Sequence, residues 1–391
     1  MPKILTNLLP LTVDIIASLI LFVGRHSLAT RGYSETTVGT LVLVYGLGYM
    51  LSSLMMTRLI RKQLVRLQML GSLAGMFVIS IFLANVQSLP AILVLYTIFP
   101  FVLSMFFNAL QIYLLGASNQ ESRPLAVTIG HFTFSWSVGF ALGPIFASFL
   151  VTQYEWSQVY YLAGLLALLV GLPLLIYKPK TALIQPEKPA ASTIAESEKA
   201  PNLVIPGWIG LLAGLAIWNT AMVFWPVQAV QLEVPNNVKG IAEFLFAITQ
   251  AFAALGLAYV IGWRTKPAWF LLFGSLGVIA LLLMSVFGGS WIFFSGFMLY
   301  GAFLGSAFSL SVYHCMLDES QAVRRVALNE TLIGLAFLLS YPLAAIFRPR
   351  SGEFGLSYAW LALLLAVALV VQALSARLVT SAATQTSQSQ P

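Results

Sequence analysis

Long apolar stretches with almost no charge constrain this chain more than any other feature. Twelve of them run for about 17–27 residues without clustered charge, which is long enough to cross the roughly 30 Å of bilayer hydrocarbon as an α-helix. Hydrophobic residues make up 59% of the 391 residues and charged residues 8%, against about 45–50% and about 25% in soluble domains. The chain is therefore not a soluble enzyme with one membrane anchor, and its unbroken runs exclude an outer-membrane barrel of alternating strands.

The twelve stretches predict an all-α membrane protein with twelve transmembrane helices. One connection is long: residues 178–205 are polar and contain prolines, and we expect a flexible cytoplasmic linker there. It separates an N-terminal six-helix half, residues 1–177, from a C-terminal six-helix half, residues 206–377, and residues 378–391 are expected to form a disordered cytoplasmic tail. The approximate helix limits are 8–24, 37–56, 67–86, 90–115, 125–151, 157–177, 206–231, 240–262, 267–287, 291–316, 326–347 and 355–376.

The basic residues predict the orientation of these helices. With the N-terminus in the cytoplasm, fifteen of the 20 Lys and Arg residues lie on the cytoplasmic side and five lie outside, in accord with the positive-inside rule. We therefore expect a multi-pass protein of the cytoplasmic membrane with both termini cytoplasmic. The basic residues form no run interleaved with aromatics, so a net charge of +7 does not indicate nucleic acid as a partner. Asp14 lies inside the first stretch, which favours a retained helix over a cleaved signal peptide.

The fifth stretch contains the strongest local motif, Gly139-Phe-Ala-Leu-Gly143-Pro144. Glycines four residues apart leave a smooth strip on one helix face, where a neighbouring backbone can approach closely. Pro144 removes one backbone donor and permits a bend. The pattern suits a helix that packs tightly yet shifts during gating. Ordinary small-residue packing is the structural alternative.

This motif, in the fifth of twelve helices and followed by the loop Gln153–Trp156, resembles the major facilitator superfamily, and in particular its drug/proton antiporters. The loop after the second helix is also similar, because Arg58, Arg61 and Lys62 match basic residues of the family, although Thr57 replaces an acidic one. The resemblance implies gating roles for six residues: Arg58, Arg61, Lys62, Gly139, Gly143 and Pro144.

The superfamily fold implies that the first, fourth, seventh and tenth helices line a central cavity. The substrate-binding candidates on these helices are Asp14, Ser18, Asn108, Gln111, Trp218, Asn219 and Tyr300. In helix four, Asn108 stands where the antiporters carry an arginine linked to proton transfer. The polar and aromatic set suits an organic solute with apolar area, because no buried Arg or Lys is expected to hold a phosphate or dicarboxylate.

Asp14, His131 and Glu330 are the candidates for proton coupling, because an ionisable group at membrane depth is costly and is by default a functional hypothesis. Each has a structural alternative: Asp14 could pair with a neighbouring helix, Glu330 could stabilise a helix N-terminus, and His131 could simply pack. Glu243 is expected at the membrane interface near an outer helix end. His26, near another helix end, carries no special weight.

Together these features predict a secondary active transporter that moves a small organic solute by alternating access, with proton-coupled export as the preferred mode. Uptake or uncoupled movement of a small metabolite remains an alternative, as does a non-transporting receptor or scaffold. The sequence has no phosphate-binding loop, metal motif or nucleophile set, and Cys315 is its lone cysteine, so we expect no enzyme activity, cofactor or metal. The expected partners are the solute and membrane lipid, and the expected state is a monomer.

Overall fold

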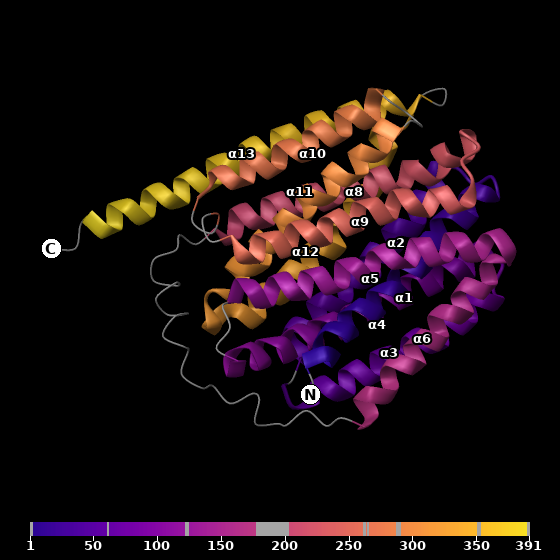
Figure 1. The fold of residues 1–391 in the computed structure, drawn as a ribbon, viewed down its shortest axis with the longest axis horizontal. Coiled ribbons are helices and arrows are strands. Elements are labelled where there is room, and N and C mark those ends of the chain that lie inside the picture. The colour runs from indigo at the N-terminus through magenta and orange to yellow at the C-terminus, as the bar shows by residue number, and fades with distance from the viewer. Residues whose placement is uncertain are drawn as a thin grey trace.

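The protein is a bundle of long α-helices (Figure 1). The computed structural model describes residues 3–60, 62–121, 125–176, 203–260, 263, 266–286, 291–349 and 353–388. The N-terminal half contains α1 (Lys3–Thr30), α2 (Glu35–Leu59), η1 (Lys62–Leu64), α3 (Val65–Asn85), α4 (Leu89–Glu121), α5 (Leu125–Gln153) and α6 (Trp156–Ile176). The C-terminal half contains α8 (Val204–Gln231), α9 (Asn236–Tyr259), α10 (Ala268–Val286), α11 (Trp291–Met316), α12 (Glu319–Ile346) and α13 (Phe354–Gln388).

Twelve helices of the described ranges are long and apolar enough to cross a membrane. The prediction of an all-α membrane protein with twelve transmembrane helices is therefore confirmed. Helices satisfy their own backbone N–H and C=O groups, which is what a hydrocarbon solvent without hydrogen-bonding partners requires. Several helices are longer than their apolar runs, and α1 continues to Thr30 although its run was predicted to end near residue 24.

The two halves repeat the same pattern of helix packing. In the N-terminal half α1 packs on α5 and α6, α2 packs on α4, and α3 packs on α4 and α6. In the C-terminal half α8 packs on α12 and α13, α9 packs on α11, and α10 packs on α11 and α13. Each of these main pairs in one half has its counterpart in the other. This agrees with two repeats related by an axis along the membrane normal.

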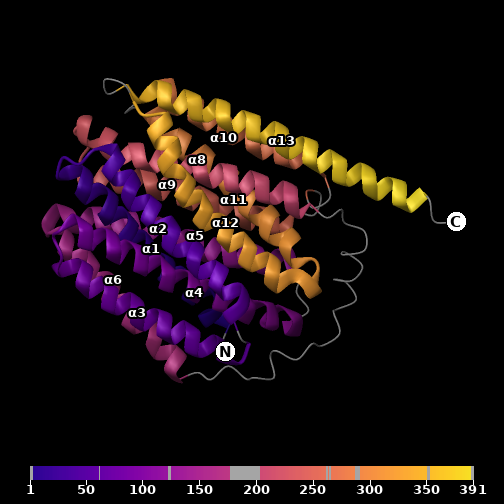
Figure 2. The same ribbon diagram turned by 180° about the vertical axis from the view of Figure 1, so that it is seen from behind.

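The halves meet along two pairs of helices, α5 with α9 and α2 with α12. Figures 1 and 2 show these helices running side by side through the middle of the bundle. We call the end of the bundle where α6 ends and α8 begins the linker end, and the opposite end, which holds the α1–α2 turn, the distal end. The linker end is the one predicted to face the cytoplasm.

Glycines bring the backbones of α1 and α5 into direct contact. A Cβ atom added at Gly139 would lie 2.0 Å from the carbonyl oxygen of Leu11, and one added at Gly143 would lie 1.9 Å from Ser18 Oγ. Both distances are far below van der Waals contact. The smooth strip read from the sequence is therefore the surface on which α1 packs.

The seams between the halves also depend on glycine. On α2 and α12, a Cβ at Gly46 would lie 2.6 Å from the backbone nitrogen of Leu338, and one at Gly334 would lie 2.5 Å from that of Met50. On α5 and α9, a Cβ at Gly130 would meet Ala258 at 2.3 Å. The two halves thus approach to backbone contact on both sides of the central axis.

The ends of two segments differ from expectation. The predicted linker, 178–205, lies mostly outside the described residues, but α8 begins at Val204 within it. The last helix, α13, continues to Gln388 and so runs into residues 378–388 of the predicted tail. These residues contain no Gly or Pro to end a helix, and their alanines and glutamines favour its continuation.

The contact between α1 and α5 predicts an asymmetric response to adding one methyl group. Gly139→Ala should lower the thermal stability of the detergent-solubilised protein, by about 1–3 kcal/mol, because a backbone carbonyl occupies the required space. Gly71→Ala is the matched control, since nothing lies within 4 Å of its added Cβ, and it should be neutral or stabilising. Equal melting temperatures for Gly139→Ala and the wild type would contradict this account of the seam.

Candidate solute-binding cavity

A central cavity of about 130 Å³ lies between the two halves. Helices α1, α2, α4 and α5 line it on one side and α8, α9, α11 and α12 on the other. Its polar lining consists of Asp14, Arg25, Tyr45, Tyr49, Gln111, Thr133, Asn219, Glu243, Gln250 and Glu330. Its aromatic lining includes Phe107, Phe132, Trp136, Phe140, Trp218, Phe246, Phe308 and Phe337. The cavity therefore combines a few hydrogen-bonding groups with large apolar surfaces, as small-molecule sites commonly do.

Asp14 faces this cavity from the linker-end half of α1 and is only 7% exposed. Its Oδ2 atom is buried without a hydrogen-bond partner in the part of the chain that the structure describes, and so is Nδ2 of Asn219 across the cavity. A buried polar atom with no partner is destabilising. One unpaired acceptor and one unpaired donor on opposite sides of the same cavity are therefore suited to a polar solute that supplies both partners.

Glu330 of α12 enters the cavity from the C-terminal half and is held by two residues of the N-terminal half. Tyr49 of α2 donates its hydroxyl to Oε2 at 2.5 Å, and Gln111 of α4 donates its amide to Oε1 at 2.6 Å. All three side chains are buried. We call Tyr49, Gln111 and Glu330 the Glu330 cluster. Both carboxylate oxygens therefore accept a hydrogen bond from a neutral donor.

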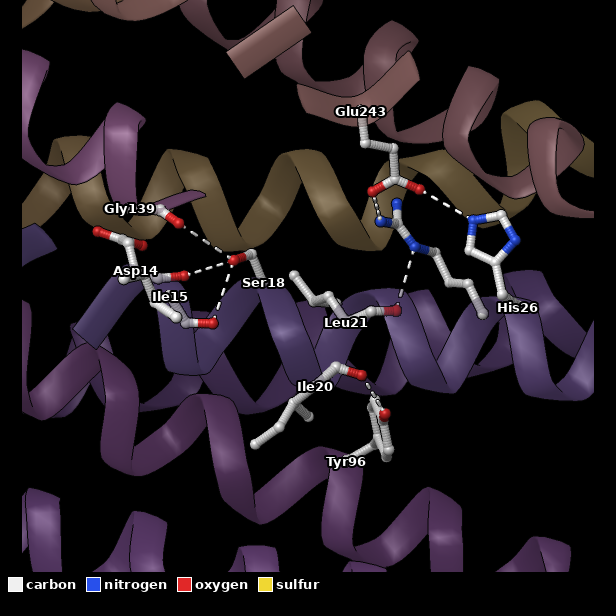
Figure 3. A network of polar contacts seen from close by, with 10 residues as sticks. Asp14, Ile15, Ser18, Ile20, Leu21, His26, Tyr96, Gly139 and Glu243 are labelled. Atoms are coloured by element: carbon white, nitrogen blue, oxygen red, sulfur yellow. Dashed lines mark hydrogen bonds and ion pairs between the residues drawn. The ribbon is translucent and has the colours of Figure 1, made fainter. Parts of the chain in front are cut away.

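A second carboxylate, Glu243 of α9, is held in the same way near the distal end (Figure 3). Arg25 Nη2 lies 2.6 Å from Glu243 Oε2, and His26 Nε2 lies 3.1 Å from Oε1. Arg25 also donates from Nε to the carbonyl of Leu21 at 3.3 Å. We call Arg25, His26 and Glu243 the Glu243 cluster. Its carboxylate has one cationic partner, unlike that of Glu330.

The Glu243 cluster corrects three expectations. Glu243 is buried in the cavity wall rather than interfacial, and His26 is fully buried against it. Arg25 is one of the five basic residues predicted to lie outside the membrane, yet it is a buried base that lines the cavity. The expectation of no buried Arg or Lys is therefore wrong. The cause is the extra length of α1, which carries Arg25 and His26 within the membrane-spanning bundle.

Trp218 of α8 lines the cavity as part of an aromatic stack. The centroid of its ring lies 3.8 Å from that of Phe246, at an interplanar angle of 15°. It lies 5.1 Å from that of Tyr300, at an interplanar angle of 23°. Tyr300, a predicted substrate-binding residue, does not line the cavity, because it packs behind Trp218 and donates its hydroxyl to the carbonyl of Gly214 at 2.8 Å. Its role in this arrangement is to fix the position of Trp218.

Three further predicted residues lie away from the cavity. Ser18 donates to the carbonyl of Asp14 at 2.7 Å, within its own helix. Asn108 bonds to the hydroxyl and the carbonyl of Ser104 on α4. His131 lies near the linker end, where its Nε2 is 3.0 Å from the hydroxyl of Tyr259 on α9. Of the predicted set, the cavity thus brings together Asp14, Gln111, Trp218, Asn219 and Glu330.

The predicted gating residues are placed unevenly. Gly139, Gly143 and Pro144 lie in the tight α1–α5 seam, and the carbonyl of Pro144 also approaches Gly240 of α9. Arg58 is exposed at the linker end of α2. Lys62 begins η1, and Arg61 lies outside the described residues. Among the residues described, no group of three or more His, Cys, Asp or Glu side chains could hold a metal ion.

A bundle of twelve spanning helices, built from two similar halves around a polar and aromatic cavity, defines a membrane transporter. The family comparison agrees: the model of the Major Facilitator Superfamily matches residues 6–318, and the chain belongs to this family. Membership supports the prediction of a transporter rather than an enzyme. A search of the curated proteins finds no match.

Solved structures share the fold at low sequence identity. The crystal structure of the human organic anion transporter MFSD10 (TETRAN) has a TM-score of 0.64 and 15% identity, over 95% of this chain and 100% of that one. The crystal structure of the nucleoside transporter NupG has a TM-score of 0.69 and 11% identity, over 97% and 99%. At such identities the likeness concerns the fold alone.

The Glu330 cluster predicts that removal of a single hydroxyl group lowers the stability of the protein. Tyr49→Phe should lower the thermal stability of the protein by about 1–3 kcal/mol, because one buried carboxylate oxygen of Glu330 loses its donor. Tyr154→Phe is the control, since the side chain of Tyr154 is 58% exposed. Melting temperatures measured in detergent should separate the two variants; identical values would refute the importance of the Tyr49–Glu330 bond.

Proposed function

We propose that this protein moves a small organic solute across the cytoplasmic membrane by alternating access, coupled to protons and in the direction of export. The observation that carries the proposal is the buried cavity between the halves, whose wall contains Asp14 with an unpartnered carboxylate oxygen. Such a site at the interface of two repeats is where transporters of this architecture bind substrate, and rocking of the halves opens it to either side.

The lining supports an organic solute with apolar area. Aromatic side chains provide most of the surface, and the Trp218–Phe246 stack gives it a rigid wall. The ionisable groups are three acids, Asp14, Glu243 and Glu330, and one base, Arg25, which Glu243 already neutralises. This balance favours a neutral or cationic solute over a multiply charged anion, because like charges in a low-dielectric site repel strongly.

Proton coupling is assigned to Asp14 and Glu330. Both carboxyl groups face the same cavity, where a proton and the polar group of a solute could occupy one site in turn. His131, the third candidate, lies outside the cavity at the contact between α5 and α9. We therefore give it no part in the exchange between proton and solute.

Export is proposed from the likeness of Gly139, Gly143 and Pro144 to the helix-five motif of the antiporters. Uptake is the second candidate, because Asn108 stands in place of the helix-four arginine of the antiporters and Thr57 replaces the acidic residue of the loop motif. The unpaired amide of Asn219 beside Trp218 would suit a neutral ring with hydrogen-bonding edges. A receptor or scaffold without transport remains the third reading, and it predicts ligand binding without flux.

The substrate screen comes first. Purified protein is melted with nucleosides, amphiphilic amines and small metabolites, and compounds that raise its melting temperature are then tested for flux in proteoliposomes with an imposed pH gradient. A transporter gives both stabilisation and flux. A ligand that stabilises the protein but never crosses the membrane would overturn transport in favour of a receptor.

In the Asp14→Asn variant, the accumulation of solute that a pH gradient drives should fall by about tenfold or more. Exchange of labelled for unlabelled solute should continue. The amide preserves the shape of the carboxyl group but carries no titrating proton. Glu155→Gln, an exposed acid in the turn after α5, is the matched control and should behave as the wild type. Gradient-driven accumulation that survives in Asp14→Asn would show that Asp14 does not couple the proton.

A further inference from the structure

We propose that the Glu243 and Glu330 clusters are two contacts, broken in alternation, that hold the halves closed at opposite ends of the cavity. The inference rests on the proposed alternating access and identifies the side chains that control it. Both clusters cross between the halves. The Glu330 cluster adjoins the α2–α12 glycine seam, where a Cβ added at Gly334 would lie 2.5 Å from the backbone nitrogen of Met50. The argument starts from which half supplies each group.

The two clusters share one arrangement. Each acid belongs to the C-terminal half, Glu243 on α9 and Glu330 on α12. Each is bound through both of its oxygens by donors of the N-terminal half. Helices α9 and α12 are also the ones by which the C-terminal half packs on its partner. When the halves rotate apart, these carboxylates must therefore leave their donors.

The clusters lie on opposite sides of the middle of the bundle. Glu243 is about 10 Å from the start of α9 at the distal end, at 1.5 Å per residue. Glu330 is about 16 Å from the start of α12 at the linker end, and its donor Tyr49 is about 15 Å from the end of α2 there. A rocking motion that opens one end therefore separates one cluster and leaves the other closed.

Burial restricts the conditions under which each cluster can break. A carboxylate that loses its partners inside the protein is strongly destabilising, whereas in an opened, water-filled mouth it becomes hydrated. A cluster can therefore break only on the side that water enters. This condition penalises a state in which a cluster is broken while its end of the cavity stays dry, because each carboxylate needs either its donors or water.

The Glu243 cluster is well placed for reversible separation. Helix α1 packs on α5 and α6, and α9 packs on α5 and α11. The long side chains of Arg25 and Glu243 therefore bridge two helices whose main packing partners are elsewhere. Parting them does not require the close glycine seam between α1 and α5 to open.

The test measures distances across the bundle without solute or gradient. In a Cys315→Ala background, nitroxide labels are attached at Tyr33→Cys and Leu232→Cys for the distal end, and at Leu59→Cys and Gln321→Cys for the linker end. All four positions are exposed. Double electron–electron resonance then reports the open and closed populations of each end.

Glu243→Gln should raise the ratio of open to closed states about tenfold at the distal pair and leave the linker pair closed. Glu330→Gln should do the reverse. Exchanging the partners, by Arg25→Glu together with Glu243→Arg, should restore the wild-type distances at the distal pair. This exchange keeps the test decisive if a single variant fails to fold.

A matched control is present in the chain. Arg348 and Glu35 also join the halves at the distal end, at 3.7 Å, but the side chain of Arg348 is 57% exposed. Glu35→Gln should leave both distance distributions unchanged, because exposed ion pairs contribute little. Unchanged distributions in folded Glu243→Gln and Glu330→Gln, or a shift of the same end by both, would overturn the proposal. Neither outcome bears on the Asp14→Asn flux test.

Discussion

The cost of an unpaired polar group in hydrocarbon governs this structure at every level. It makes the chain helical, because each helix bonds its own backbone, and it directs hydroxyl groups back to their own helix. Ser18, Thr220 and Ser309 each donate to the carbonyl four residues earlier, at 2.7–2.9 Å. The same cost explains why the carboxylates of Glu243 and Glu330 are held through both oxygens. Among the described residues of the cavity wall, Asp14 Oδ2 and Asn219 Nδ2 are the buried exceptions, and the proposed solute would supply their partners.

Helix packing follows from the same solvent. Apolar side chains gain little free energy when they move from lipid into a helix contact. The helices therefore associate through close contact of small residues and through a few polar bonds. Gly139 and Gly143 let α1 approach α5, and Gly46 and Gly334 let α2 approach α12. The polar bonds between the halves then specify how the halves pair. They can be broken and re-formed without rebuilding an apolar core.

Much of this architecture could be predicted from the sequence. Bilayer thickness sets a length that apolar runs either reach or miss, and Gly139 and Gly143 stand out at a fixed spacing. Asp14 was visible as an acid within such a run. The Glu243 cluster was missed because charge ends an apolar run, so Arg25 and His26 read as loop residues. Only the position of Arg25 on the Asp14 face of one continuous helix could have indicated the cavity, and a contact across more than 200 residues leaves no local pattern.

The clusters show how far the two repeats have diverged. Both acids come from one half and all their donors from the other, although the helices of the halves correspond pair by pair. Two copies of the C-terminal half would face each other with uncompensated acids, and two copies of the N-terminal half would confront a guanidinium with no counterion. A symmetric ancestor of this chain could not have used these contacts. These contacts therefore require one N-terminal half and one C-terminal half, and the two halves are not interchangeable.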